Sequence, residues 1–218
     1  MTDEVDKTVP QERQRRYRQQ MAPERRAERR SRLLTAALEA FSTRGYRATT
    51  IEQLCSAAGV LTRNFYEEFA GREALLATLG DILNQRAFDA VVAAIAGLDP
   101  ADLAGRARAG VRAYFEVMTA DPRWARIALV ESVGVSAEME AHRRAPLERF
   151  AALIEGEANR MVELGRAPTR DYSLTVIALV GATNELIYTW VRRPDREEIV
   201  ESVINEATRL FLAVVEAA

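Results

Sequence analysis

Apolar residues recur every three to four positions along most of the chain and nowhere alternate over a useful length, which predicts helices and no strands. The first clear stripe predicts a helix from Pro23 to about Arg44, followed by Gly45, where a left-handed residue commonly ends a helix. The stripe consists of Leu33, Leu34, Ala37, Leu38 and Phe41.

Two short helices are predicted next, over about 51–58 and 62–69, with Gly59 between them. Thr49 or Thr50 can cap the first, and Glu52 stands at a capping-box distance from Thr49. Helices this short are unstable alone in water, so they must share a core with the preceding helix. The expected core residues are Leu34, Leu38, Phe41, Ile51, Leu54, Val60, Phe65 and Phe69.

Longer helices are predicted after residue 72, which gives about nine helices in an all-α fold. They cover about 73–97, 101–120, a shorter stretch after Pro122, 137–164, and two more that start near Pro168 and Pro194. Residues 1–22 are polar, and we expect a disordered, basic arm there. The predicted domains are therefore the arm at 1–22, a three-helix domain at 23–72 and a larger helical domain at 73–218.

Charge is unevenly distributed, although the net charge of the 218 residues is only −2. Residues 1–72 hold 14 Arg and Lys against 10 Asp and Glu, whereas residues 73–218 hold 16 against 22. The segment Arg13–Arg32 alone contains nine arginines and two acids. A basic N-terminal part suggests a polyanionic partner, with a solvated tail as the alternative.

Several classes of protein are disfavoured by the composition. No apolar run approaches the roughly 20 residues that span a bilayer, and no apolar segment follows the N-terminal charges, so we expect a cytoplasmic protein without a membrane partner. One Cys and one His leave little for a disulfide or a metal site. With no recognisable nucleophile, acid–base pair or phosphate-binding loop, we expect no enzyme, no catalytic residues and no cofactor.

Two short helices at a tight glycine turn, packed on a third helix, are typical of a helix-turn-helix that presents its second short helix to the major groove. The side chains of that helix suit base edges, since Arg can pair with guanine and Asn with adenine. Thr50 at the preceding helix start suits a phosphate, and Thr49 beside it is also a candidate for DNA contact. The candidate DNA-contacting residues on the second short helix are Thr62, Arg63, Asn64 and Tyr66.

The stretch "LLTAALEAFSTRGYRATTIEQLCSAAGVLTRNFYEEFAGREALL" resembles the tetracycline-repressor (TetR) family of transcriptional regulators. The resemblance covers about 45 residues and includes Gly45-Tyr46, the Thr49-Thr50 pair, Ala58-Gly59-Val60, Phe65-Tyr66 and Arg72-Glu73. It implies phosphate contacts from Thr50, Tyr66 and Arg72. It also implies a homodimeric regulator, usually a repressor, that binds a palindromic double-stranded DNA operator and is released by a small-molecule effector.

Three positions depart from the family pattern. Leu61 replaces the usual capping Ser or Thr, so we expect a weak cap at the second short helix. Arg63 replaces a small residue, and Glu68 replaces a frequent His. A carboxylate repels phosphates, so Glu67 and Glu68 either turn away, pair with Arg72 or Arg47, or reject wrong sequences.

The resemblance also implies roles for the C-terminal helices. The last two are expected to form a four-helix bundle with a second copy, with ordinary monomer core as the alternative. The dimerisation candidates are Val176, Val180, Thr183, Ile204, Thr208, Phe211 and Val215. Apolar residues with sparse polar groups suggest an effector chamber, with candidates Phe88, Tyr114, Met118, Trp124, Ile127, Glu131, Phe150, Asn184 and Tyr188. A second reading of the whole chain is a ligand-independent or architectural DNA-binding protein that uses the Arg-rich arm.

Overall fold

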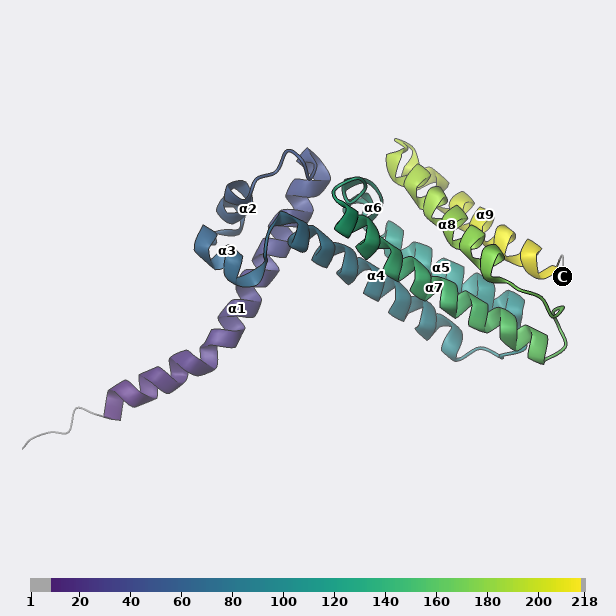
Figure 1. The fold of residues 1–218 in the computed structure, drawn as a ribbon, viewed down its shortest axis with the longest axis horizontal. Coiled ribbons are helices and arrows are strands. Elements are labelled where there is room, and N and C mark those ends of the chain that lie inside the picture. The colour runs from purple at the N-terminus through teal and green to yellow at the C-terminus, as the bar shows by residue number, and fades with distance from the viewer. Residues whose placement is uncertain (1–8, 217–218) are drawn as a thin grey trace, which may run out of the picture.

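A computed structural model describes residues 9–216, and every regular element in that part of the chain is a helix (Figure 1). The first part holds α1 (Val9–Arg44), α2 (Ile51–Ala58) and α3 (Thr62–Glu68). The remainder holds α4 (Arg72–Ala96), α5 (Leu103–Thr119), α6 (Pro122–Arg126), a π-helical turn η1 (Ile127–Glu131), α7 (Ala137–Glu163), α8 (Ser173–Arg192) and α9 (Arg196–Glu216). The predicted all-α class is confirmed, and most helix ends lie within a few residues of the expected ones.

The main difference lies at the N-terminus. Helix α1 begins at Val9, so Pro23 lies inside the helix and not in its first turn. The disorder expected for residues 1–22 therefore does not extend over Val9–Ala22, and residues 1–8 lie outside the described part. Pattern analysis missed this start because the segment is polar all round and has no apolar stripe to reveal a helical period.

A first hydrophobic core holds α1, α2 and α3 together. Six of the eight expected core residues are buried in it, while Leu34 and Ile51 are partly buried at its edge. The core also takes in residues from farther along the chain: Leu75, Leu76 and Leu79 of α4, Ile127 of η1 and Met139 of α7. Because these later residues pack with α1–α3, the three-helix domain (α1–α3), the expected DNA-binding domain, is not independent of the C-terminal domain (α4–α9).

A second core lies within the C-terminal domain, between α4, α5, α6, α8 and α9. Its buried members are Leu83, Ala87, Val111, Phe115, Met118, Ala125, Ile187, Trp190, Val203, Ile204 and Ala207. Helix α4 contributes to both cores, through Leu75–Leu79 at its start and through Leu83 and Ala87 one to two turns later. It therefore packs against both domains.

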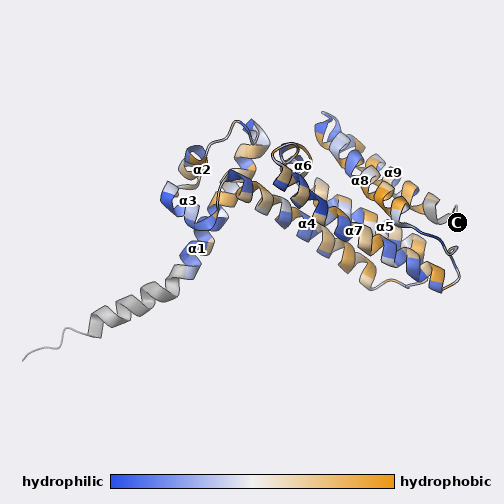
Figure 2. Cartoon of the chain, viewed as in Figure 1, coloured by the Kyte–Doolittle hydropathy of each residue, from blue (hydrophilic) through white to orange (hydrophobic). Residues whose placement is uncertain are grey.

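Helices α8 and α9 lie side by side at the edge of the molecule (Figure 1). Hydrophobic residues continue along the surface of α8 (Figure 2), where Leu174 is 78% exposed and Ile177 is 61% exposed. Among the described helices, α8 alone is long and apolar enough to cross a membrane by length and composition, a test that a core helix of a soluble protein also passes. This outer face of α8 lacks a partner within the protomer.

Candidate DNA-binding surface and ligand cavity

The corner between α2 and α3 is built by Gly59, which adopts φ 62° and ψ 40° in the left-handed region, as predicted. Val60 follows it, is buried, and donates its backbone N–H to the Cys55 carbonyl at 2.9 Å. The cap of α2 is Thr50, and its capping-box partner is Gln53, not the Thr49–Glu52 pair suggested by spacing. The backbone of Thr50 is extended, and its hydroxyl accepts the backbone N–H of Gln53 in the first turn of α2.

The outward side of α3 carries the polar residues that the sequence singled out. Thr62 and Arg63 are exposed, Asn64 is partly exposed and Tyr66 is 57% exposed, while Phe65 on the opposite side is buried. Arg63 Nε donates to Asn64 Oδ1 at 3.4 Å, so the two planar groups lie together. Leu61 provides no side-chain cap, as expected, which leaves the first N–H groups of α3 without a side-chain acceptor from this residue.

Two candidate phosphate contacts have other roles in the structure. Thr49 is fully buried and its hydroxyl donates to the Gly45 carbonyl at 2.9 Å, so the prediction that Thr49 touches DNA is wrong. Arg72 donates through Nη1 to the carbonyls of Tyr46 and Thr49, and its guanidinium lies over the Tyr46 ring at 5.0 Å. Arg72 therefore fixes the turn that precedes α2 onto the start of α4.

The two acids at the end of α3 face α1. Glu68, whose side chain is only 1% exposed, pairs with Arg26 at 3.1 Å and Arg29 at 3.2 Å, and Glu67 pairs with Arg29 at 3.4 Å. The pairing suggested from sequence, with Arg72 or Arg47, is not the one formed: Arg47 donates to the Gly134 carbonyl. The partners lie on α1 because α3 packs across that helix.

Glu131 links the two domains. Its Oε2 accepts the backbone N–H of Tyr46 at 2.8 Å, and its Oε1 accepts from Arg126 Nε at 3.1 Å. The contact is possible because Gly45, with φ 92°, turns the backbone of the α1–α2 loop toward η1. The role predicted for Glu131 in binding an effector is wrong, since its carboxylate is occupied by the DNA-binding domain.

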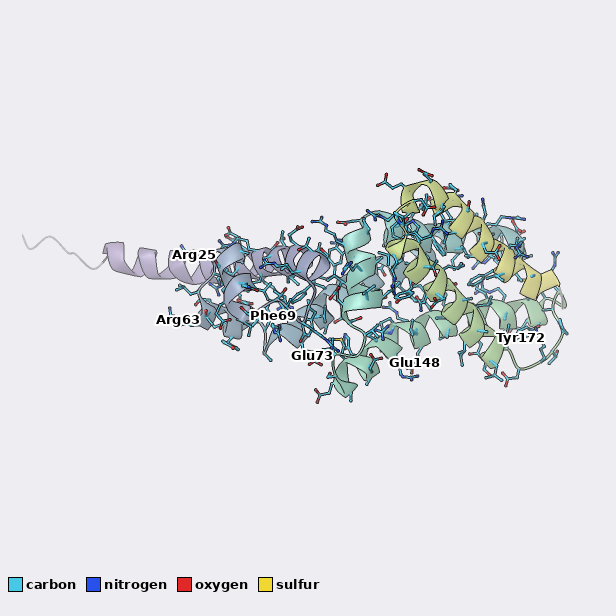
Figure 3. All side chains as sticks on the ribbon, turned by 90° about the horizontal axis from the view of Figure 1, so that it is seen from above. Arg25, Arg63, Phe69, Glu73, Glu148 and Tyr172 are labelled. Atoms are coloured by element: carbon cyan, nitrogen blue, oxygen red, sulfur yellow. The ribbon has the colours of Figure 1, made fainter. Side chains whose placement is uncertain are left out.

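A mainly apolar cavity lies between α4, α5, α7 and α8, with Phe211 of α9 at its wall and a free volume of about 150 Å³. Its walls are mostly aliphatic and aromatic side chains, which suits an apolar ligand. Tyr172, labelled in Figure 3, lies on the wall at the start of α8. The other principal lining residues are Val91, Ile95, Val111, Tyr114, Leu147, Phe150, Leu153, Ile154, Met161, Val176, Leu179, Val180, Thr183 and Asn184.

Two polar pairs interrupt this apolar wall. The Tyr114 hydroxyl donates to Asn184 Oδ1 at 3.2 Å, and burial raises the pKa of Tyr114 far enough to keep the phenol neutral. At another wall, the buried Arg106 forms two hydrogen bonds of 2.7 and 2.9 Å with Glu157. Hydrogen bonding to Glu157 raises the pKa of Arg106, so the guanidinium stays charged. Within each pair, the two side chains satisfy each other's hydrogen-bonding groups. This matters because an unpaired polar group in this cavity would carry a large desolvation cost.

Three of the nine residues expected in the effector chamber line this cavity: Tyr114, Phe150 and Asn184. Phe88 lies behind the wall, with its ring 5.4 Å from that of Phe150. Met118 is buried in the second core and Ile127 in the first. Trp124 packs between the cores and Tyr188 is bonded to Arg192, so neither lines the cavity. Sequence reasoning missed the aliphatic lining because a cavity wall and a packed core have the same residue types.

The expected dimerisation residues lie mostly inside the protomer. Val176, Thr183 and Ile204 are buried, and their assignment to a dimer face is wrong. Val180 and Phe211 are half-buried at the cavity, and Thr208 is half-buried beside a shallow surface pocket. The side chain of Val215 lies outside the described residues.

The fold and this surface define the class of the protein: a helical regulator that presents a helix-turn-helix and carries a ligand cavity in a separate domain. Residues 33–79 match the family described as "Bacterial regulatory proteins, tetR family". Residues 33–79 therefore form a DNA-binding domain of the TetR type.

Similar proteins cover most of the chain. It is 29% identical over 192 residues to the HTH-type transcriptional activator FasR of Mycolicibacterium smegmatis, covering 84% of this chain and 82% of that protein. The fold matches the fatty acid degradation regulator FadR of Bacillus halodurans with a TM-score of 0.72, 20% identity, and 83% and 94% of the two chains covered.

Two further structures were solved with ligands. FadR from Bacillus subtilis, in complex with stearoyl-CoA, has a TM-score of 0.69 at 18% identity, with 82% of this chain and 97% of that chain covered. AibR, in complex with isovaleryl coenzyme A and operator DNA, has a TM-score of 0.62 at 18% identity, with the same coverages. These relatives are DNA-binding regulators, in agreement with the expectation that the chain is not an enzyme.

Proposed function

We propose that the protein is a homodimeric regulator that binds a palindromic operator through α3 and is released from it by an acyl-coenzyme A thioester. The observation that carries the proposal is the mainly apolar cavity in the C-terminal domain, which α4 connects to the core of the helix-turn-helix domain. The two ligand-bound neighbours with coenzyme A thioesters support this ligand class.

The homodimer is supported by the outer face of α8. Leu174, Ile177, Ala178 and Gly181 follow one another at helical spacing on this face, and all are exposed in the protomer. Exposed apolar stripes of this kind are costly in water, and a second copy related by a two-fold axis would cover them with the same stripe. A dimer would hold two α3 helices at the spacing of about 34–36 Å that successive major grooves require.

In the cavity, the acyl chain would lie against the aliphatic wall. The thioester carbonyl needs a hydrogen-bond donor in such surroundings, and the amide of Asn184 is placed to supply one, since its oxygen already accepts from Tyr114. The larger nucleotide part of coenzyme A would remain outside the apolar region, in water. The protein would thereby recognise the acyl chain of the ligand by burying it and the thioester carbonyl by one hydrogen bond.

The coupling between cavity and operator would run through α4. Its residues Val91 and Ile95 line the cavity, and its first turns pack into the core of the DNA-binding domain. A ligand that prefers a different α4 position lowers DNA affinity by the difference in its affinity for the two states, typically 1–3 kcal/mol or about 5- to 150-fold.

The test uses the purified full chain and a duplex enriched from a random pool by the same chain. Stearoyl-CoA, isovaleryl-CoA and coenzyme A are added in turn, and binding to the duplex is followed by fluorescence anisotropy. We expect a 5- to 150-fold loss of DNA affinity with an acyl-CoA and none with coenzyme A alone. Unchanged affinity with every thioester would refute the proposed effector.

Filling the cavity provides a matched control. Val180→Trp places a large ring in the cavity and should abolish the response to the thioester while DNA binding without ligand remains. Val92→Trp makes the same change on the exposed side of α4 and should leave the response intact. A full response from Val180→Trp would place the ligand elsewhere.

One observation favours the alternative that the protein activates transcription when bound to DNA. Family resemblance suggests a repressor, whereas the relative of 29% identity is named an activator. A promoter–reporter assay decides between them, since a repressor deletion raises expression and an activator deletion lowers it.

A further inference from the structure

The N-terminal extension, which we define as Val9–Ala22 of α1, projects beyond α2 and α3 on the side away from the C-terminal domain (Figure 1). Arg63 of α3 and Arg25 of α1 lie at this same end of the molecule (Figure 3). DNA held by α3 would therefore pass close to the extension. A helix of 14 residues is about 21 Å long, which corresponds to roughly six base pairs of duplex.

The direction of α1 relative to α3 is fixed by the carboxylate clamp, which we define as Glu67 and Glu68 with Arg26, Arg29 and Arg30. Besides the ion pairs already described, Arg26 Nη2 donates to the Glu67 carbonyl at 3.0 Å and Arg30 Nη1 to the Glu68 carbonyl at 3.1 Å. These carbonyls lie in the last turn of α3, where the helix provides no donors of its own and favours positive charge. The clamp thus ties the end of the reading helix to α1.

The arginines of the clamp differ from those of the extension in their partners. Arg26, Arg29 and Arg30 are neutralised by carboxylates or occupied by carbonyls of α3. The sequence of the extension adds four arginines and only one acid, Glu12. These four are Arg13, Arg15, Arg16 and Arg18.

Such a sequence makes a poor isolated helix. Like charges three or four residues apart destabilise a helix, and this segment has no apolar stripe to pack against the protein. A row of phosphates would remove the repulsion, and each arginine that contacts a phosphate releases a condensed counterion. The charge of the extension therefore complements the duplex that α3 reads.

We propose that the N-terminal extension is a second DNA-contact surface, which binds backbone phosphates flanking the groove read by α3 and contributes affinity without sequence discrimination. This inference rests on the proposed operator binding by α3. The clamp positions the extension, because a shift of α1 would break its bonds to both the acids and the last carbonyls of α3.

The test compares two full-length variants, each lacking four positive charges. The first is Arg13→Gln, Arg15→Gln, Arg16→Gln and Arg18→Gln; the second changes four exposed arginines of the C-terminal domain, Arg108→Gln, Arg144→Gln, Arg166→Gln and Arg170→Gln. Affinity for the enriched duplex and for a scrambled duplex is measured between 50 and 300 mM salt, roughly the range over which counterion release is resolved.

For the extension variant we expect at least tenfold weaker binding to both duplexes at about 100 mM salt, and a salt slope reduced by about 2 or more, since each lost phosphate contact lowers it by about 0.9. The ratio of the two affinities should stay within about threefold of the wild-type ratio. Phosphate ethylation beyond the α3 half-sites should inhibit the wild type and not this variant.

A wild-type slope in the extension variant would overturn the inference, as would an equal loss of slope in the C-terminal variant, which would indicate a general effect of net charge. If the wild-type chain enriches no duplex at all, the proposed operator binding fails instead. Circular dichroism of each variant verifies that the helical fold is retained.

Discussion

At the scale of single residues, the sequence identified the exposed side of α3, and burial decided the rest. Thr62, Arg63, Asn64 and Tyr66 all have exposed surface, whereas Thr49 is enclosed and bonded to Gly45. Spacing could not separate Thr49 from Thr50, because adjacent residues differ by only about 100° around a helix and the choice depends on how the preceding turn packs. In the structure, the Gly45 carbonyl accepts the Thr49 hydroxyl, which leaves Thr50 as the cap of α2.

The residue-scale prediction concerns Asn64 and Tyr66. Asn64→Ala should reduce the discrimination between the enriched duplex and single-base variants of it by about 1–3 kcal/mol, because a bidentate base contact is lost. Tyr66→Phe should weaken binding to all duplexes alike, because it removes the hydroxyl that we expect to contact the phosphate backbone. Competition anisotropy against a panel of duplexes measures both.

The way in which Asn64→Ala changes the affinities for operator and random DNA tests its assignment as a base contact. If Asn64→Ala weakened operator and random DNA equally, Asn64 would be a backbone contact and not a base contact. Thr35→Ala, on the exposed side of α1 with its hydroxyl bonded within the helix, is the matched control and should change neither quantity.

At the scale of elements, the important link is between the α1–α2 loop and η1. The Glu131 carboxylate bonds the Tyr46 N–H, and the Arg47 guanidinium donates to the Gly134 carbonyl at 3.1 Å, so two contacts cross the domain boundary in opposite directions. The sequence contained Glu131 as a lone acid in an apolar helix, which we interpreted as a ligand contact. The partner lies 85 positions away in the chain, a pairing that only the packing of η1 against α1 creates.

We predict that Glu131→Gln weakens the coupling between ligand and DNA. The amide can still accept one hydrogen bond but loses the charge that strengthens the bonds to Tyr46 and Arg126, about 1 kcal/mol or more. The ratio of DNA affinities with and without acyl-CoA should move toward one, while ligand affinity changes by less than about threefold. Isothermal titration and anisotropy measure the two affinities.

The control is Glu206→Gln, since Glu206 pairs with Arg209 of the same helix and has no bond to the DNA-binding domain among the described residues. The same substitution there should leave the coupling unchanged. Full coupling in Glu131→Gln would show that the Glu131–Tyr46 contact does not transmit the effect of the ligand.

At the scale of the whole molecule, the outer face of α8 is the surface on which the proposed dimer depends. The sequence predicted that the last two helices pair with a second copy but selected residues that are buried in the protomer, such as Val176 and Ile204. The error has a physical cause: α8 is apolar on several faces, so periodicity does not tell which face meets the cavity and which meets the solvent. The exposed residues Leu174 and Ile177 identify the outer face.

We predict that Ile177→Asp converts the dimer to a monomer, because a charge in each copy would be buried against its symmetry mate. Operator affinity should fall more than tenfold, since one half-site contact is lost, and the helical content should remain. Analytical ultracentrifugation and anisotropy provide the readouts. Leu164→Asp, at an exposed site beyond the end of α7, is the control and should retain the wild-type mass. A wild-type mass for Ile177→Asp would exclude this face.

The sequence by itself determined the helices, the glycine-built corner and the family, because these depend on local spacing: apolar periods, caps and a left-handed glycine each act within a few residues. Tertiary structure alone decided which apolar residues enclose a cavity, which acid holds the two domains together and which face of α8 is left uncovered. Those outcomes depend on the relative placement of helices far apart in the chain, and side chains of the same type serve in core, cavity and interface.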